Sequence, residues 1–81
     1  MFGLRIWLHN RAIRHILVQA LDFEKDRLGL DQAEAVAEYI SYDEFGLAHD
    51  HIVDVLEDQD LVPMLQTSKL LLDAEKMMSH V

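Results

Sequence analysis

The sequence predicts an all-α fold, a small four-helix bundle with short connections. Apolar residues recur three and four positions apart along almost the whole chain, the spacing of one face of an α-helix. No segment alternates apolar and polar residues for long enough to indicate a strand. A chain of 81 residues has room for one hydrophobic core, so residues 1–81 are expected to form a single domain.

The first helix is predicted from about Asn10 to Arg27. Asn10 is a residue type that commonly caps helix N-termini, and Gly29 ends the helix because glycine tolerates the left-handed conformation found there. Residues 1–9 either extend this helix or precede it as an N-terminal arm. Its apolar stripe comprises Ile13, Ile16, Leu17, Ala20 and Leu21, with Glu24 in the same register.

The second helix is predicted to start after Asp31, an N-cap residue type. Glu34, three positions further on, completes a capping box with it. A short turn near Ser41 and Tyr42 follows the helix. The predicted buried stripe comprises Ala33, Val36, Ala37 and Ile40.

The third helix is predicted from about Asp43, with Gly46 inside its first turn. A glycine inside a helix costs about 1 kcal/mol relative to alanine. Its presence therefore suggests that a neighbouring helix approaches closely at this point. The predicted inward positions are Phe45, Ala48, Ile52, Val55 and Leu56.

The fourth helix follows a last loop at residues 60–62. Pro63 fits its first turn, where the N–H that proline lacks is not needed. A four-helix domain of this size has a thin core, so association into a homodimer would help to cover its apolar residues. The predicted stripe of this helix comprises Leu70, Leu71, Ala74, Met77, Met78 and Val81.

The composition excludes several classes of function. Fifteen acidic and seven basic residues give a net charge of −8, so the chain is a poor candidate for direct contact with nucleic acid. Without cysteine there is neither a disulfide framework nor a thiolate site. No apolar run approaches the roughly 18 residues of a membrane span, and the apolar start, interrupted by Arg5, lacks the features of a secretion signal. We therefore expect a cytoplasmic protein that does not bind membranes.

Two histidines flank an acid in His49-Asp50-His51, the local sequence that most suggests a metal site. Positions two apart on a helix point to nearly opposite sides, whereas side chains three or four apart converge. We expect surface or half-buried histidines, and neither a metal nor another cofactor. No nucleophile lies in a recognised catalytic setting, so the sequence indicates a protein that is not an enzyme.

Trp7, with Phe2 and Ile6, has two interpretations. Either these side chains anchor the chain to a membrane or a partner, or they pack into the N-terminal part of the core. Core packing is the favoured interpretation, because buried aromatic side chains dominate small cores.

The charge is concentrated in residues 28–60, which hold ten acidic residues and no lysine or arginine. Asp43 and Glu44 place two of these acids at the start of the third helix, where the helix dipole favours anions. A solvated face normally mixes charges of both signs, so a segment of one sign favours a surface that steers a basic partner over an inert surface. An acidic ridge along the third helix, at positions i, i+4, i+7 and i+8, comprises Asp50, Asp54, Glu57 and Asp58.

Three stretches carry a family resemblance: Glu34-Ala-Val-Ala-Glu-Tyr-Ile40, Asp43-Glu-Phe-Gly-Leu-Ala48 and Ile52-Val-Asp-Val-Leu-Glu57. They resemble the small MafI-type immunity proteins of bacterial polymorphic toxin systems. The resemblance covers about residues 13–78, and the first ten residues have no counterpart in it.

The resemblance implies a helical protein that binds and neutralises a cognate toxin domain, a basic nuclease of the RNase class. The charge agrees, because a nuclease that grips phosphate presents cations that carboxylates can bind. The alternative is an acidic DNA mimic or adaptor that regulates a nucleic-acid-binding partner. The predicted contact residues are Asp43, Glu44, Asp50, Asp54, Glu57 and Asp58, with Tyr39 and Tyr42 as aromatic anchors.

Overall fold

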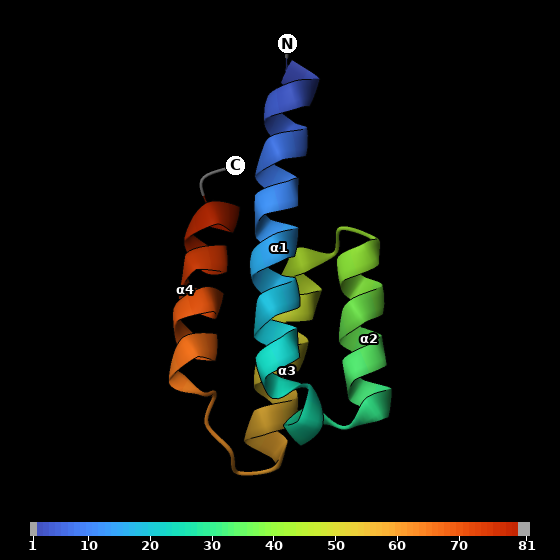
Figure 1. The fold of residues 1–81 in the computed structure, drawn as a ribbon, viewed down its shortest axis with the longest axis vertical. Coiled ribbons are helices and arrows are strands. Elements are labelled where there is room, and N and C mark those ends of the chain that lie inside the picture. The colour runs from blue at the N-terminus through green and yellow to red at the C-terminus, as the bar shows by residue number, and fades with distance from the viewer. Residues whose placement is uncertain (1, 80–81) are drawn as a thin grey trace.

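Four α-helices make up the fold, as the sequence predicts (Figure 1). Successive helices run in alternate directions along the long axis, so the short connections give an antiparallel bundle. A computed structural model describes residues 2–79 and contains no strand within them. In this structure α1 spans Phe2–Leu28, α2 Leu30–Ser41, α3 Phe45–Asp58 and α4 Leu65–Ser79.

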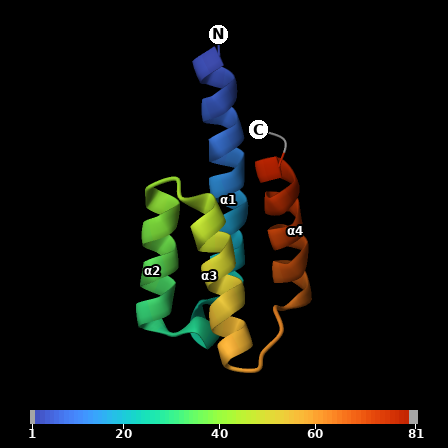
Figure 2. The same cartoon turned by 180° about the vertical axis from the view of Figure 1, so that it is seen from behind.

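Helix α1 is the centre of the bundle. Its 27 residues span about 40 Å, close to the 44 Å long axis of the molecule. Helices α2, α3 and α4 all pack against α1, whereas α3 and α4 touch each other only slightly (Figure 2). The buried apolar core comprises Ile13, Leu17, Ala20, Leu28, Val36, Ile40, Phe45, Ala48, Ile52, Leu56, Leu71 and Ala74.

The start of α1 differs from the prediction. The helix begins at Phe2, so residues before Asn10 extend it, and Asn10 lies inside the helix rather than at its cap. No proline interrupts this stretch, so the helix continues through it. The predicted end is confirmed, because Gly29 has a φ of 87°, a left-handed value that only glycine adopts without strain.

The capping box predicted for α2 is wrong. Gly29 itself is the N-cap, and its carbonyl accepts the Ala33 N–H (2.9 Å), which completes the first helical turn. Because a single residue joins α1 to α2, Asp31 already lies inside the helix. Neither Asp31 nor Glu34 makes a capping hydrogen bond.

The apolar stripes predicted for the first three helices are confirmed at most positions. Ala37 is the exception: α2 meets its neighbours along the line of Val36 and Ile40, which leaves Ala37 exposed on the outer side. The other predicted residues are buried or half-buried: Ile13, Ile16, Leu17, Ala20, Leu21, Glu24, Ala33, Val36, Ile40, Phe45, Ala48, Ile52, Val55 and Leu56.

The turn between α2 and α3 is tight. Helix α3 starts at Phe45, two residues later than predicted, because Asp43 has a φ of 58° that no right-handed helix accommodates. The Glu44 N–H donates to the Tyr39 carbonyl (2.9 Å), and the Glu44 carbonyl accepts the Ala48 N–H (3.0 Å). Glu44 therefore joins the end of α2 to the first turn of α3 as its N-cap.

Gly46 is exposed on α3, and a Cβ built there would meet no atom within 4 Å, so the predicted close approach of a neighbouring helix is wrong. Gly46→Ala should therefore raise the free energy of unfolding by about 0.5–1 kcal/mol, as urea unfolding would measure. Gly29→Ala is the control and should lower it, because a φ of 87° strains any residue with a Cβ. A less stable Gly46→Ala protein would contradict the open site.

Pro63 lies in the connection before α4, not in the first turn where the sequence places it. Helix α4 starts at Leu65, and the Met64 carbonyl accepts the Ser68 N–H (2.8 Å) in its first turn. The Met64 N–H donates to Glu24 on α1 (2.8 Å), and this contact holds the start of α4. Along α4, Leu71 and Ala74 are buried, Leu70, Met77 and Met78 are half-buried, and Val81 lies outside the described residues.

The N-terminal end of α1 projects beyond the other helices (Figure 1). The α2–α3 turn reaches α1 at the level of Arg14, whose guanidinium pairs with Asp43. The C-terminal end of α4 also stops short of the end of α1 (Figure 2). Residues 3–8, all of which are exposed, form what we call the overhang.

The core packing predicted for Trp7 and Ile6 is wrong. Trp7 and Ile6 are 55% and 59% exposed, because the neighbouring helices are too short to reach them. The side chain of Phe2 lies outside the described part of the structure. None of the helices within residues 2–79 combines the length and the apolar composition that a membrane crossing requires.

Candidate functional site

The acidic ridge of α3 faces solvent. All four of its side chains are exposed, on the side of the helix opposite to the buried Ile52 and Leu56. Asp54, Glu57 and Asp58 form no ion pair with any residue between 2 and 79. The ridge therefore presents a negative potential along the outer flank of the second half of α3, which no ion pair offsets at Asp54, Glu57 and Asp58.

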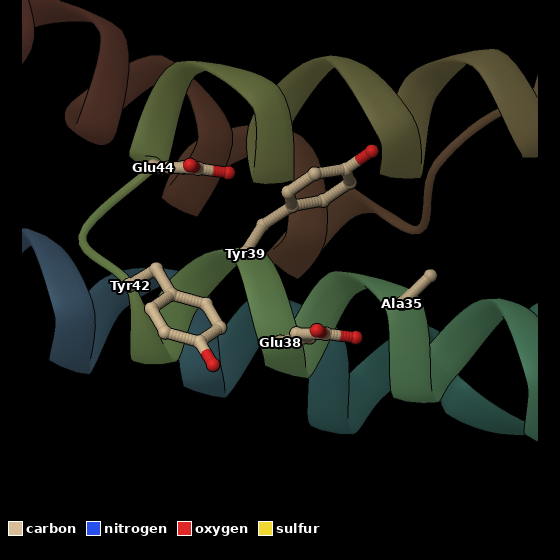
Figure 3. Close-up of a pocket in the computed structure, with 5 residues that line it drawn as sticks. All are labelled: Ala35, Glu38, Tyr39, Tyr42 and Glu44. Atoms are coloured by element: carbon tan, nitrogen blue, oxygen red, sulfur yellow. The ribbon is translucent and has the colours of Figure 1, made fainter.

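A hollow of about 510 Å³, which we call the turn hollow, lies where α2 turns into α3 (Figure 3). Ala35 and Glu38 stand three positions apart on one face of α2, and Tyr42 is the C-cap of the same helix. The small Ala35 side chain leaves the space open. Figure 3 shows the Tyr42 ring beside Glu38, with Tyr39 extending from α2 toward α3. The hollow is lined by Ala35, Glu38, Tyr39, Tyr42 and Glu44.

The two tyrosines of the turn hollow differ in how far their rings are exposed to solvent. Tyr39 is half-buried, and its ring packs edge-on against His51 of α3, with ring centroids 5.7 Å apart. Tyr42 is 70% exposed and leaves its ring available for contact. One fixed and one free aromatic ring, flanked by two carboxylates, form a wall that suits a cationic side chain.

The structure divides the predicted contact residues into three groups. Tyr39, Tyr42 and Glu44 meet at the turn hollow, and the acidic ridge runs along α3 from there. Asp43 belongs to neither, because it turns toward α1 and pairs with Arg14. Glu38 was not among the predicted contacts, although it lines the same hollow as Glu44.

The two histidines of the His49-Asp50-His51 step point apart, as their spacing predicts. His51 Nε2 lies 2.6 Å from the Gln32 Oε1 on α2. His49 is buried, not at the surface or half-buried as predicted, and joins α3 to α4: Nδ1 lies 3.0 Å from Asp50 and Nε2 3.2 Å from Glu75. Within residues 2–79, no three His, Asp or Glu side chains are arranged to hold a metal ion.

Glu24 is a buried charge, with 0% of its surface exposed. Its Oε1 accepts from the Arg27 Nε (2.8 Å), and its Oε2 accepts from the Met64 N–H (2.8 Å). Arg27 extends the network, because its guanidinium donates to the Val62 carbonyl (2.8 Å) and its own carbonyl accepts from Gln59 (3.1 Å). This network fastens the α3–α4 connection to the end of α1.

The environment of Glu24 lowers the pKa of its carboxyl group. Burial alone would raise this pKa, because it disfavours the charged form. The hydrogen bonds from the Met64 N–H and from Arg27, together with the positive charge of Arg27, outweigh burial. Glu24 is therefore held as a carboxylate, and its role is structural, unlike that of the exposed acids.

The turn hollow and the acidic ridge together offer a means of binding cations. Carboxylates of Glu38 and Glu44 can form charge-assisted hydrogen bonds with a guanidinium or ammonium group, and the Tyr42 ring can stack on it. The ridge beside them supplies long-range attraction. Comparison of the chain with models of protein families, with curated proteins and with solved structures finds no match.

Proposed function

We propose that the chain is an immunity-type inhibitor, which binds a basic toxin domain in the cytoplasm of the producing cell and blocks its nuclease activity. One observation carries the proposal. Helices α2 and α3 expose a surface on which carboxylates are gathered without a lysine or arginine, beside a hollow with tyrosine walls. A surface of one sign with aromatic anchors is suited to a basic protein partner.

Binding would proceed in two stages. The acidic ridge attracts the basic partner and orients it, which raises the association rate. An arginine or lysine of the partner then enters the turn hollow, between Glu38 and Glu44 and against Tyr42. Most of the affinity of an interface comes from a few such desolvated anchors, and the rim contributes mainly to the association rate.

Reversing two charges of the ridge tests the steering stage. Asp54→Lys with Asp58→Lys should lower the association rate constant at least tenfold at low ionic strength, because it replaces attraction by repulsion. The matched control is Asp22→Lys with Asp26→Lys, which makes the same charge change at the same spacing on α1. Surface binding kinetics over a series of salt concentrations measure both. Equal rate losses in the two variants would remove the ridge from the proposal.

The partner itself is to be captured from the host, with the wild-type chain and both double variants as bait. We expect a basic nuclease domain that the wild type and the α1 control retain and the ridge variant loses. Deleting the gene for this chain should kill cells only when the nuclease gene is intact. Capture of a nucleic-acid-binding regulator instead would favour the DNA-mimic alternative, and capture of no basic protein would contradict both.

A further inference from the structure

The overhang carries a large amount of exposed apolar surface. Within five residues of α1, four large apolar side chains are at least half exposed: Leu4, Ile6, Trp7 and Leu8. Exposed apolar surface of this extent on a soluble protein marks an interaction site. It lies beyond the ends of the other helices, so nothing in the described residues covers it (Figure 1).

Ile6 continues the core face of α1, whereas Leu4 and Leu8, each two positions from Ile6, point to nearly the opposite side of the helix. Ile6 stands seven positions before Ile13 and eleven before Leu17, which places the three side chains in one line along the helix. Ile13 and Leu17 are fully buried, whereas Ile6 is 59% exposed. The line of contact therefore extends past the bundle. At its edge, His9 has a buried Nε2 atom without a hydrogen-bond partner in residues 2–79.

The overhang and the α2–α3 turn have opposite charges. Residues 3–13 contain Arg5 and Arg11 and no acid, and the Arg11 guanidinium lies over the Trp7 ring, 5.3 Å from its centre. The turn at the foot of the overhang carries Asp43 and Glu44, and only Asp43 is neutralised there, by Arg14. One molecule thus carries both a basic, apolar overhang and an acidic α2–α3 turn beside it.

We propose that the overhang binds a second copy of this chain in an antiparallel two-fold dimer. Each overhang lies in the space above the α2–α3 turn of the other copy, where α1 projects past α2 and α3 (Figure 1). An antiparallel arrangement brings the basic end of one α1 toward the acidic turn of the other. A two-fold axis uses each contact twice and closes the assembly at two copies. An acidic chain is repelled by anionic lipid, which makes a membrane surface the less suitable occupant.

The dimer can be followed with Trp7, because it is the single tryptophan of the chain and lies in the proposed interface. Raising the concentration of the full chain from about 1 µM to 1 mM should shift its emission to shorter wavelength and double the mass in sedimentation equilibrium. Ile6→Gln should weaken the dimer at least tenfold. Leu47→Gln is the control, at a similar exposure of 54%, and should leave the dimer intact.

A charge variant tests the proposed orientation. Arg5→Glu should also weaken the dimer at least tenfold, whereas Lys69→Glu on α4, with the same change of charge, should not. A chain that stays monomeric up to 1 mM would overturn the proposal. So would a dimer that Ile6→Gln and Leu47→Gln weaken equally, or a Trp7 shift that requires neutral or anionic phospholipid vesicles. Circular dichroism and thermal melts confirm that each variant is folded. Because the ridge is unaltered in these variants, capture of a basic partner remains an independent test of function.

Discussion

Glu24→Gln is expected to lower the free energy of unfolding by about 2–3 kcal/mol at pH 7. The substitution keeps the shape of the side chain but removes the charge that Arg27 and the Met64 N–H contact, 2.8 Å away in each case. Hydrogen bonds to a charged group contribute more than neutral ones, and the loss of one partner leaves the other partly buried and unpaired. Arg27 is one-third exposed, so water partly compensates and the loss stays below that of a fully buried pair.

The control for Glu24 is Asp26→Asn, which removes an exposed acid two positions away on the same helix. Its effect should stay within about 0.5 kcal/mol, as for most surface substitutions. Chemical unfolding followed by circular dichroism measures both variants. A Glu24→Gln protein as stable as the wild type would mean that the network does not hold the α3–α4 connection to α1.

The pH dependence of stability gives the same prediction a second measurement. The pKa of Glu24 is lowered in the folded protein, so its contribution is complete above about pH 4.5, the ordinary pKa of a glutamate. The contribution is lost as the pH falls further, through the folded-state pKa. The stability difference between wild type and Glu24→Gln should therefore be largest near neutral pH and shrink in acid. A difference that does not change with pH would show that shape, not charge, matters at this position.

The fold could be predicted from the sequence because it depends on periodicity. The stripes from Ile13 to Leu56 each occur at helical spacing, and the structure buries most of them. The ends of the helices were harder to predict from the sequence, because they depend on which backbone groups find hydrogen-bond partners. The start of α4 depends on a hydrogen bond from Met64 to Glu24, 40 positions earlier, and no local pattern contains that information.

The candidate site could be predicted in part, for the same reason. The ridge follows from spacing alone, since positions i, i+4, i+7 and i+8 share a face of any helix. The turn hollow depends on how α2 meets α3, so the participation of Glu38 was not predicted. Glu24 did leave a signal: a carboxylate in register with an apolar stripe must find buried partners. The pattern does not name those partners, since Met64 comes from a distant connection.

Ile52→Ala is expected to have an effect as large as that at Glu24, because it removes a fully buried side chain beneath the acidic ridge. Deleting this much of a packed core lowers the free energy of unfolding by about 2–4 kcal/mol. A domain of this size has a total of roughly 4–12 kcal/mol, so a large part of the stability would be lost. Leu47→Ala is the control on the same helix, 54% exposed, and should change stability by less than about 0.5 kcal/mol.

Salt distinguishes packing from charge in this variant. The carboxylates of the ridge repel one another, and the buried apolar face of α3 opposes that repulsion by holding the helix in the bundle. Sodium chloride screens exposed charges, so it should raise the melting temperature of wild type and Ile52→Ala alike and leave their difference unchanged. A difference that vanishes in salt would mean that Ile52 opposes ridge repulsion instead of filling the core. If the difference persists, the apolar face of α3 stabilises the fold independently of the acids, and those acids are free to serve the binding of a basic partner.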